Sequence, residues 1–282
     1  MPAEAMAKVN LSLRVRARDA SGLHPVFSIA QSIDWCDSLA LEGSDDDSLV
    51  VTGLAVPEDE SNLAWRALEA VRALAGSRSP VALTLAKRIP VAAGLGGGSA
   101  DAAAALVLAG IRYRVERTSL EALAPSLGSD VPFCLAGGTA RIEGYGQEIT
   151  PLPFVGGYAL AVVVPPFEMA TAVVYRRWDE IGCPDGDLVE ARSLPPALRY
   201  LDLANDLTRA AVAVEGDLGD WMADLRRSWG RPVLMSGSGP SLFGFFGDAE
   251  EAAQAAVVAG ARAGRACVPG PQGWSVPSGT LP

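Results

Sequence analysis

Lysine is almost absent from this sequence. The chain has 23 basic residues, of which only Lys8 and Lys87 are lysines, against 33 acidic residues, and its formal net charge is −10. A chain without a basic surplus lacks the usual electrostatic footprint of a nucleic-acid-binding protein, so no nucleic-acid partner is expected. The two remaining lysines are candidates for a role that needs a compact point charge, or they survive by chance.

Paired cysteines and long apolar runs are also lacking. None of the four cysteines forms a C-x-x-C pair, which argues against a zinc site and favours reduced thiols in a cytoplasmic protein. The N-terminus has no signal-peptide pattern, and the longest apolar run, Tyr158 to Val164, is far shorter than the ~20 residues of a membrane helix. No membrane partner is expected. The cysteines are Cys36, Cys134, Cys183 and Cys267.

Strand and helix patterns alternate irregularly in the first half of the chain. Alternation predicts strands at Val9 to Val15 and Val81 to Leu85, and Val26 to Leu41 holds further short apolar pieces. Helical spacing is clear from Asn62 to Ala75 and in the Ala-rich stretch Ser99 to Ala109. The second of these helices is predicted to end at Gly110, and another helix pattern covers Ser119 to Leu127. The mixture predicts an α+β fold.

The character of the chain changes near residue 152, between Pro151 and Pro153. We therefore predict two domains, residues 1–152 and 153–282, with the active site in the cleft between them. The tail from Pro269 is rich in Pro, Gly and Ser and is predicted to be loosely held. The second half is predicted to contain strands at Tyr158 to Val164 and Ser241 to Phe246, and helices at Thr171 to Trp178, Asn205 to Ala213, Leu218 to Ser228 and Ala249 to Ala263.

A glycine loop, Pro90 to Asp101, is the strongest local signal. It reads PVAAGLGGGSAD and lies between a predicted strand and a small-residue helix. Glycines let a ligand approach the backbone closely, and a helix N-terminus favours anions. The loop therefore predicts a phosphate cradle with Ser99 as a hydroxyl contact, although a structural turn also fits.

Two better-known phosphate loops do not match the sequence. A P-loop needs Gly-Lys-Ser/Thr, and no lysine follows these glycines. A dinucleotide loop needs G-x-G-x-x-G/A, but counting from Gly94 the sixth position is Ser99, and counting from Gly96 it is Asp101. A nicotinamide oxidoreductase is thus disfavoured. A second glycine loop, Met235 to Pro240, is weak by itself.

Four segments in a fixed order resemble the galactokinase–homoserine kinase–mevalonate kinase (GHMP) superfamily. They are Ala7-Lys8-Val9-Asn10, the glycine loop, Leu127 to Phe133 (LGSDVPF) and the second glycine loop. Within the superfamily the chain is most similar to the branch that phosphorylates 4-diphosphocytidyl-2-C-methyl-D-erythritol in the non-mevalonate isoprenoid pathway. The match covers nearly the whole chain, from about Ala7 to Phe246.

The resemblance implies a kinase that uses ATP as co-substrate, with Mg²⁺ expected on the nucleotide and no protein metal ligand identified. Asp130 would be the general base for the substrate's 2-hydroxyl, with Lys8 beside it. The sequence alone leaves a helix N-cap open for Asp130 and a surface position open for Lys8. ATP contacts would come from Asn62, Pro90, Ala93, Gly94, Leu95, Gly96, Gly97, Gly98, Ser99 and Ala100, and substrate contacts from Asn10, Leu23, His24, Thr171 and Tyr175.

The chain departs from the family at Leu23, where an aromatic residue usually stacks on cytosine opposite the position of Tyr175. Leu23 provides no π-stacking, which is worth ~1–3 kcal/mol per base. The departure predicts weaker cytidine affinity or a different alcohol substrate. A catalytically silent ligand-binding protein is the remaining alternative, and a monomer or weak homodimer is expected.

Overall fold

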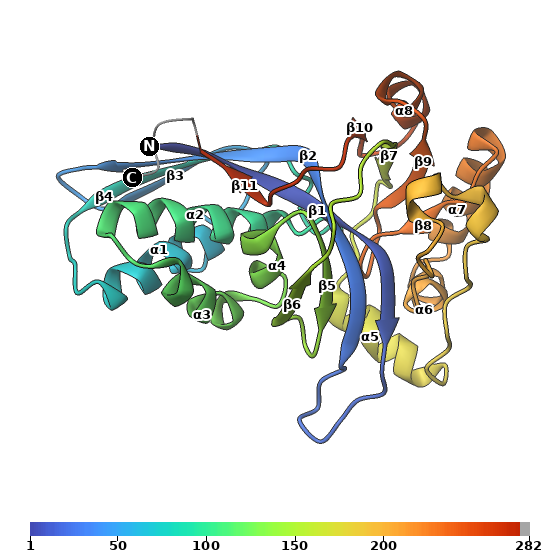
Figure 1. Cartoon of the computed structure of the whole chain (residues 1–282), viewed down its shortest axis with the longest axis horizontal. Helices are drawn as coiled ribbons and strands as arrows, with labels where there is room; N and C mark the ends of the chain where they lie inside the picture. The colour runs from blue at the N-terminus through green and yellow to red at the C-terminus, as the bar shows by residue number, and fades with distance from the viewer. Residues whose placement is uncertain (277–282) are drawn as a thin grey trace.

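The computed structural model of the chain describes residues 1–276, in which two β-sheets lie next to each other along the long axis (Figure 1). The seven-stranded sheet has the path β11-β1-β2-β4-β3, and β5 joins it through β2. A continuous 18-residue β2 replaces the short pieces expected there, because β1 pairs along most of its length and β5 and β4 pair with separate parts of it. The strands are β1 (Pro2–Val15), β2 (Val26–Gly43), β3 (Ser48–Gly53), β4 (Val81–Lys87), β5 (Thr139–Glu143), β6 (Glu148–Pro151) and β11 (Trp274–Ser275).

Four helices cover one face of this sheet: α1 (Leu63–Leu74), α2 (Gly97–Tyr113), α3 (Arg117–Leu127) and α4 (Val131–Ala136). The central α2 is buried from Ala100 to Gly110, because its small side chains let it pack closely among its neighbours. The predicted end at Gly110 is wrong, since α2 continues to Tyr113. Gly110 instead faces α3, where an added Cβ would lie 2.6 Å from Leu120 Cδ1.

The second half of the chain forms a four-stranded antiparallel sheet of order β10-β7-β9-β8 with its own helices. The predicted Ala-rich helix ends at Ala256 rather than Ala263, because Ala263 begins a strand that pairs with Val164 of β7. The elements are β7 (Ala159–Val164), β8 (Leu234–Met235), β9 (Leu242–Phe246), β10 (Ala263–Cys267), α5 (Thr171–Glu180), η1 (Ala191–Ser193), η2 (Pro196–Leu198), α6 (Thr208–Val214), α7 (Asp217–Trp229) and α8 (Ala249–Ala256).

One apolar cluster joins the two halves. It contains Val9 and Ile33 from the first sheet and Leu160, Val162 and Phe243 from the second, each essentially excluded from solvent. A second cluster lies between the first sheet and its helices, and a third lies between the second sheet and its helices. Both β1 and β2 contribute side chains to all three clusters, which fixes the side chains that they present to the site.

The tail returns to the first sheet instead of hanging loosely. Pro269 bridges Ile33, the Gly270 N–H donates to the Ser32 carbonyl, and β11 pairs with β1. The prediction of a loose tail is therefore wrong for residues 269–276, and residues 277–282 lie outside the described part. The two sheets divide near residue 152 apart from β11, and the division into domains stays a prediction.

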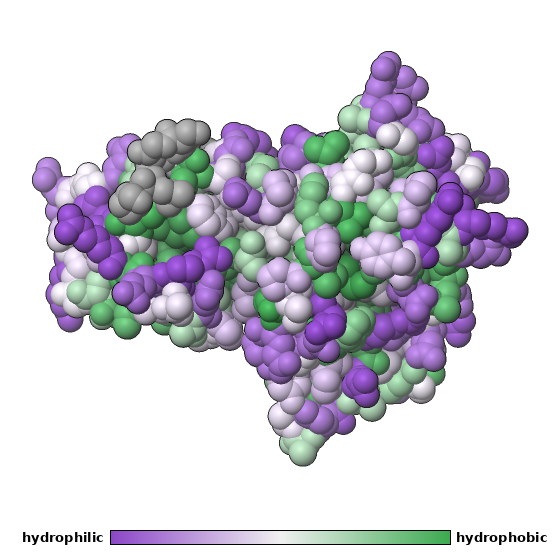
Figure 2. All heavy atoms as spheres, viewed as in Figure 1, coloured by the Kyte–Doolittle hydropathy of each residue, from purple (hydrophilic) through white to green (hydrophobic). Residues whose placement is uncertain are grey.

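Residues 1–276 also bear on the expectations about membrane helices and cysteines. No helix in this part of the chain is long and apolar enough to cross a membrane. All four cysteines are free, and burial raises the pKa of Cys36 to about 11. Figure 2 shows hydrophilic residues gathered at the outer end near α7 and apolar residues in small groups elsewhere on that face.

Candidate active site

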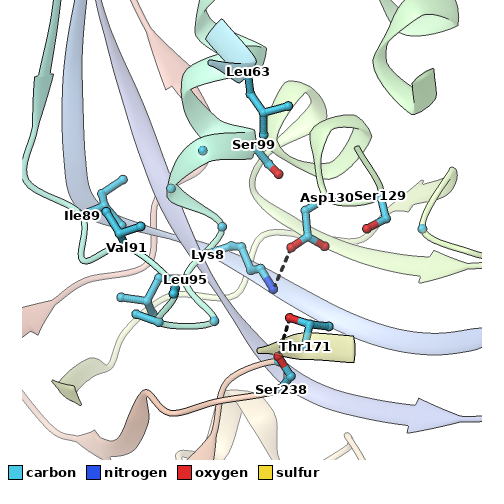
Figure 3. Close-up of a pocket in the computed structure, with 18 of the residues that line it drawn as sticks. Lys8, Leu63, Ile89, Val91, Leu95, Ser99, Ser129, Asp130, Thr171 and Ser238 are labelled. Carbon is cyan, nitrogen blue, oxygen red and sulfur yellow. Dashed lines mark hydrogen bonds and ion pairs between the residues drawn. The ribbon is translucent and has the colours of Figure 1, made fainter. Parts of the chain in front are cut away.

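A pocket of about 650 Å³ is lined by residues from both halves of the chain. The first half supplies the glycine loop, the middle of β1, the start of β2 and the end of β4, and the second half supplies the start of α5 and the second glycine loop. Figure 3 shows that Lys8, Ser99, Asp130 and Ser238 converge there from four separate segments, beside Thr171 of α5. The four segments that carried the family resemblance therefore meet in space.

The glycine loop turns sharply before α2 begins. Gly94 and Gly96 adopt left-handed φ angles of 75° and 71°, and Gly96 is the N-cap position of the 17-residue α2. An added Cβ on Gly96 would lie 3.0 Å from Lys8 Cγ, and one on Gly94 would overlap the Ser236 carbonyl. Backbone N–H groups at the start of α2 therefore lie at the pocket with no side chain at Gly96 to cover them, as an anion cradle requires.

Lys8 and Asp130 form an ion pair in this pocket. The distance from Lys8 Nζ to Asp130 Oδ2 is 3.2 Å, and Figure 3 shows the lysine pointing to the carboxylate. The Lys8 side chain is 6% exposed and that of Asp130 is 37% exposed. The cation is thus enclosed, whereas the carboxylate remains accessible to a substrate. A surface position for Lys8 is excluded.

A chain of hydrogen bonds fixes the Lys8 ammonium. Lys8 Nζ donates to Asn10 Oδ1 (2.6 Å), and Asn10 Nδ2 donates to Ser28 Oγ (2.8 Å). Ser236 Oγ accepts from the Asn10 N–H (3.2 Å) and donates to the Gly94 carbonyl (2.9 Å). Asn10 and Ser236 therefore tie the lysine to both glycine loops and hold its charge in one position.

The Asp130 side chain does not cap the helix that it precedes. Asp130 is the N-cap residue of α4, but its side chain makes no capping hydrogen bond and its φ and ψ are −89° and −11°. Good N-caps have extended ψ values and accept a backbone N–H bond. The carboxylate is turned toward Lys8 instead, which leaves it available for chemistry.

The remaining pocket wall contains His24, Thr171 and Tyr175, and we call it the acceptor end after the ligand that the family resemblance implies there. The His24 Nε2 atom lies 2.8 Å from Asp179 Oδ1, and the His24 ring centroid lies 5.1 Å from that of Tyr175. Thr171 Oγ1 and Ser238 Oγ are 2.9 Å apart, which joins the start of α5 to the second glycine loop (Figure 3). Burial raises the pKa of Tyr175, so its hydroxyl stays neutral.

Most residues expected to contact ligands line this pocket. Two do not: Leu23 lies outside the lining with its side chain 53% exposed, and Ala100 is wholly buried inside α2. Asn62 lines the pocket but also caps α1, since its Oδ1 accepts from the Ala64 N–H at 2.9 Å. The expected residues in the lining are Lys8, Asn10, His24, Asn62, Pro90, Ala93, Gly94, Leu95, Gly96, Gly97, Gly98, Ser99, Asp130, Thr171 and Tyr175.

Sequence reasoning missed a buried charge cluster behind the glycine loop. Lys87 Nζ donates to Asp37 Oδ2 and, at 2.7 Å, to Asp101 Oδ2, and all three side chains are at most 4% exposed. Lys87 and Asp101 also line the pocket. The scarcity of lysine was a signal for Lys87, but Asp37 is fifty residues away and only the β2–β4 pairing brings it close.

The two carboxylates compete for one ammonium. Burial raises the pKa of Asp101 to about 7, against the opposing effect of Lys87, and Asp37 raises it further. Burial disfavours the Lys87 ammonium, but both carboxylates outweigh this and raise its pKa. Asp101 Oδ1 is buried without a hydrogen-bond partner. These observations agree on a cluster that holds an extra proton on Asp101 at acidic pH.

A metal ion would find few protein ligands here. In residues 1–276 no group of three or more His, Cys, Asp or Glu side chains is arranged to hold one. Asp101 and Ser99 are oxygen-bearing residues of the pocket lining. Such a sparse oxygen set fits Mg²⁺ that is carried mainly by nucleotide phosphates.

Comparison with known proteins agrees with this site. The model of the GHMP kinase N-terminal domain matches residues 62–138, which include the glycine loop and Asp130. The 4-diphosphocytidyl-2-C-methyl-D-erythritol kinase of Geobacter metallireducens is 38% identical over 259 residues, covering 90% of this chain and 92% of that protein. The enzyme of the same name from Pelotomaculum thermopropionicum is 38% identical over 266 residues, covering 89% and 91%.

Solved structures give the same result. A crystal structure of 4-(cytidine 5'-diphospho)-2C-methyl-D-erythritol kinase superposes with a TM-score of 0.76 at 33% identity, over 96% of this chain and all of that one. Homoserine kinase from Cytophaga hutchinsonii, at 19% identity and a TM-score of 0.70 over 98% and 97% of the two chains, shares the fold. With its glycine loops and its Lys8–Asp130 pair in one pocket, the chain belongs to the 4-diphosphocytidyl-2-C-methyl-D-erythritol kinase family of the GHMP kinases.

Proposed function

We propose that this chain transfers the γ-phosphoryl group of ATP to the 2-hydroxyl of 4-diphosphocytidyl-2-C-methyl-D-erythritol. The observation that carries the proposal is the Lys8–Asp130 pair, 3.2 Å apart and adjacent to the glycine loop in one pocket. Family membership indicates the substrate. The two charged side chains account for proton removal and for charge stabilisation. Phosphoryl transfer asks a protein mainly for positioning and charge stabilisation.

Asp130 acts as the general base in this proposal. Its partly exposed carboxylate accepts the proton of the 2-hydroxyl while the oxygen attacks the γ-phosphorus, and the bond to the bridging oxygen of ADP breaks. Lys8 keeps the carboxylate in place and offers positive charge to the negative charge that develops on the transferred group. Asn10 holds Lys8 in that position.

The glycine loop binds the triphosphate. N–H groups at the start of α2 lie at the pocket, and the α2 dipole favours a polyanion there. Ser99 adds a hydroxyl on the same turn. When bound with the nucleotide, Mg²⁺ would neutralise phosphate charge. The side chains that would contribute oxygen ligands to it are Ser99 and Asp101 of the pocket lining.

The acceptor is tested by comparing alcohols under identical conditions. ADP release would be measured with ATP, Mg²⁺ and, in turn, 4-diphosphocytidyl-2-C-methyl-D-erythritol, mevalonate and homoserine. We expect kcat/KM for the cytidine substrate to exceed the others by at least ~10³-fold, because the pocket must pair the polar groups of its proper ligand. Higher kcat/KM for another alcohol would reassign the substrate, and no turnover with any alcohol would favour a binding protein.

The same proposal includes a two-domain enzyme, divided near residue 152, that works in the cytoplasm as a monomer or weak homodimer. The placement of the pocket lining in both halves of the chain supports the division. Sedimentation velocity across a range of protein concentrations measures the assembly state directly.

A further inference from the structure

The turn between β5 and β6 carries an aromatic side chain that the reaction above does not use. Tyr145 lines the pocket, yet 38% of it is exposed. Among the described residues of the lining, Tyr145 and Tyr175 are the only phenylalanine, tyrosine or tryptophan side chains. An aromatic ring that remains half exposed inside a ligand pocket has a face available for a ligand.

Backbone contacts place this turn on the acceptor side of the pocket. Gly146 packs against Ser129, the neighbour of Asp130 in the chain, so closely that an added Cβ would lie 2.5 Å from the Ser129 carbonyl oxygen. On the other side, the Gly144 carbonyl accepts from the Val26 N–H at 2.7 Å. Tyr145 thus lies between the general base and the β1–β2 loop that contains His24.

The Tyr145 hydroxyl is tied to that loop. It donates to Asp19 Oδ2, and it lies 3.5 Å from Ser21 Oγ. A hydrogen bond from Ser21 and, to a smaller extent, one from Tyr145 lower the pKa of Asp19 to about 2. The Asp19 carboxylate therefore stays ionised at neutral pH. A ring held at its far end loses little conformational freedom when a ligand contacts its face.

Leu23 belongs to the same loop but does not share this position. Its side chain is 53% exposed and outside the lining, whereas the neighbouring His24 turns inward against Asp179 and Tyr175. The aromatic rings at this end of the pocket therefore come from His24, Tyr175 and Tyr145. Leu23 does not contribute to the pocket wall.

We propose that Tyr145 is a specificity-determining residue that contacts the heteroaromatic base of the acceptor. The identity of that base as cytosine rests on the proposed function. Base–aromatic stacking tolerates many geometries because every base has a π-face. A tyrosine from the β5–β6 turn thus provides the aromatic contact that Leu23 does not.

Kinetics with Tyr145→Leu and Tyr145→Phe test the contact. The leucine variant is expected to raise the KM for the cytidine substrate by ~10-fold, with kcat and the KM for ATP within about 2-fold, as loss of one stacking contact implies. The phenylalanine variant keeps the ring and should stay within ~3-fold of wild type. Tyr200→Leu, the same change at an exposed tyrosine outside the pocket, is the matched control.

Calorimetric titration with cytidine diphosphate gives a readout that is independent of turnover. Wild type should bind it ~10-fold more tightly than Tyr145→Leu and no differently from Tyr200→Leu. Equal affinity of wild type and Tyr145→Leu, or no measurable binding to wild type, would overturn the inference. If binding depends on Tyr145 but no phosphoryl transfer occurs, the inference stands and the proposed function fails.

Discussion

Lys8 and Asp130 are 122 positions apart in the sequence, and the fold brings their charged atoms to 3.2 Å. Their short motifs singled out both residues, because each motif is a local run of a few residues. The cluster of Lys87, Asp37 and Asp101 escaped prediction. Its members come from β4, β2 and α2, so only strand register and helix docking determine that they meet.

The buried cluster predicts a specific dependence of stability on pH. The pKa of Asp101 rises from 3.8 to about 7 on folding, so the folded chain binds this proton more tightly than the unfolded chain. The contribution of Asp101 to the free energy of unfolding should therefore decrease as the pH rises from about 4 to 7, and it should change no further above pH 7. A folded-state pKa that is higher than the unfolded-state pKa by one corresponds to about 1.4 kcal/mol.

Urea unfolding of wild type and Asp101→Asn at pH 5 and pH 8 measures this effect. Wild type should lose more unfolding free energy between the two pH values than the variant, by up to a few kcal/mol. Equal losses in the two proteins would show that Asp101 does not take up a proton on folding.

Among the elements, the presence of α2 and of the loop before it was predicted, because glycine and alanine dominate that stretch, although α2 runs past the predicted end at Gly110. Other boundaries depended on partners far away in sequence. Alanine at 256–263 favours helix in isolation, but pairing of β10 with β7 ends α8 at Ala256. Likewise β2 runs through 18 residues because β1, β4 and β5 each pair with part of it.

The glycine loop predicts a substitution that impairs both nucleotide binding and stability. Gly96→Ala forces a side chain onto a residue with φ of 71° and to 3.0 Å from Lys8 Cγ. We expect a stability loss of ~1 kcal/mol or more together with a raised KM for ATP and a lower kcat. Steady-state kinetics and thermal unfolding measure both effects. Gly247→Ala, at a site with open space and ordinary φ, is the control; equal kinetics in the two variants would contradict the cradle.

At the scale of the whole molecule, two sheets share one apolar cluster and the C-terminal strand returns to the first sheet. Composition predicted the α+β class and the change of character near residue 152. It did not predict the returning tail, since proline and glycine there resemble a linker. In the fold those small residues allow close backbone packing, because an added Cβ on Gly273 would overlap the Cys134 carbonyl.

The returning tail therefore contributes to stability. Gly273→Ala is expected to lower the free energy of unfolding by ~1–3 kcal/mol through this overlap. Chemical denaturation compares it with Gly247→Ala, which should stay within ~0.5 kcal/mol of wild type. A Gly273→Ala protein as stable as wild type would show that the tail does not dock as described.

An Asp130→Asn variant shows whether phosphoryl transfer depends on the Asp130 carboxylate. Single-turnover transfer from ATP to 4-diphosphocytidyl-2-C-methyl-D-erythritol would be followed in wild type and Asp130→Asn, with calorimetry of ATP binding to show that the variant is folded. The amide keeps the size of the side chain but cannot take the proton, so transfer should slow by ~10²–10⁴-fold while ATP affinity is retained. Transfer by the variant at the wild-type rate would show that Asp130 is not the general base.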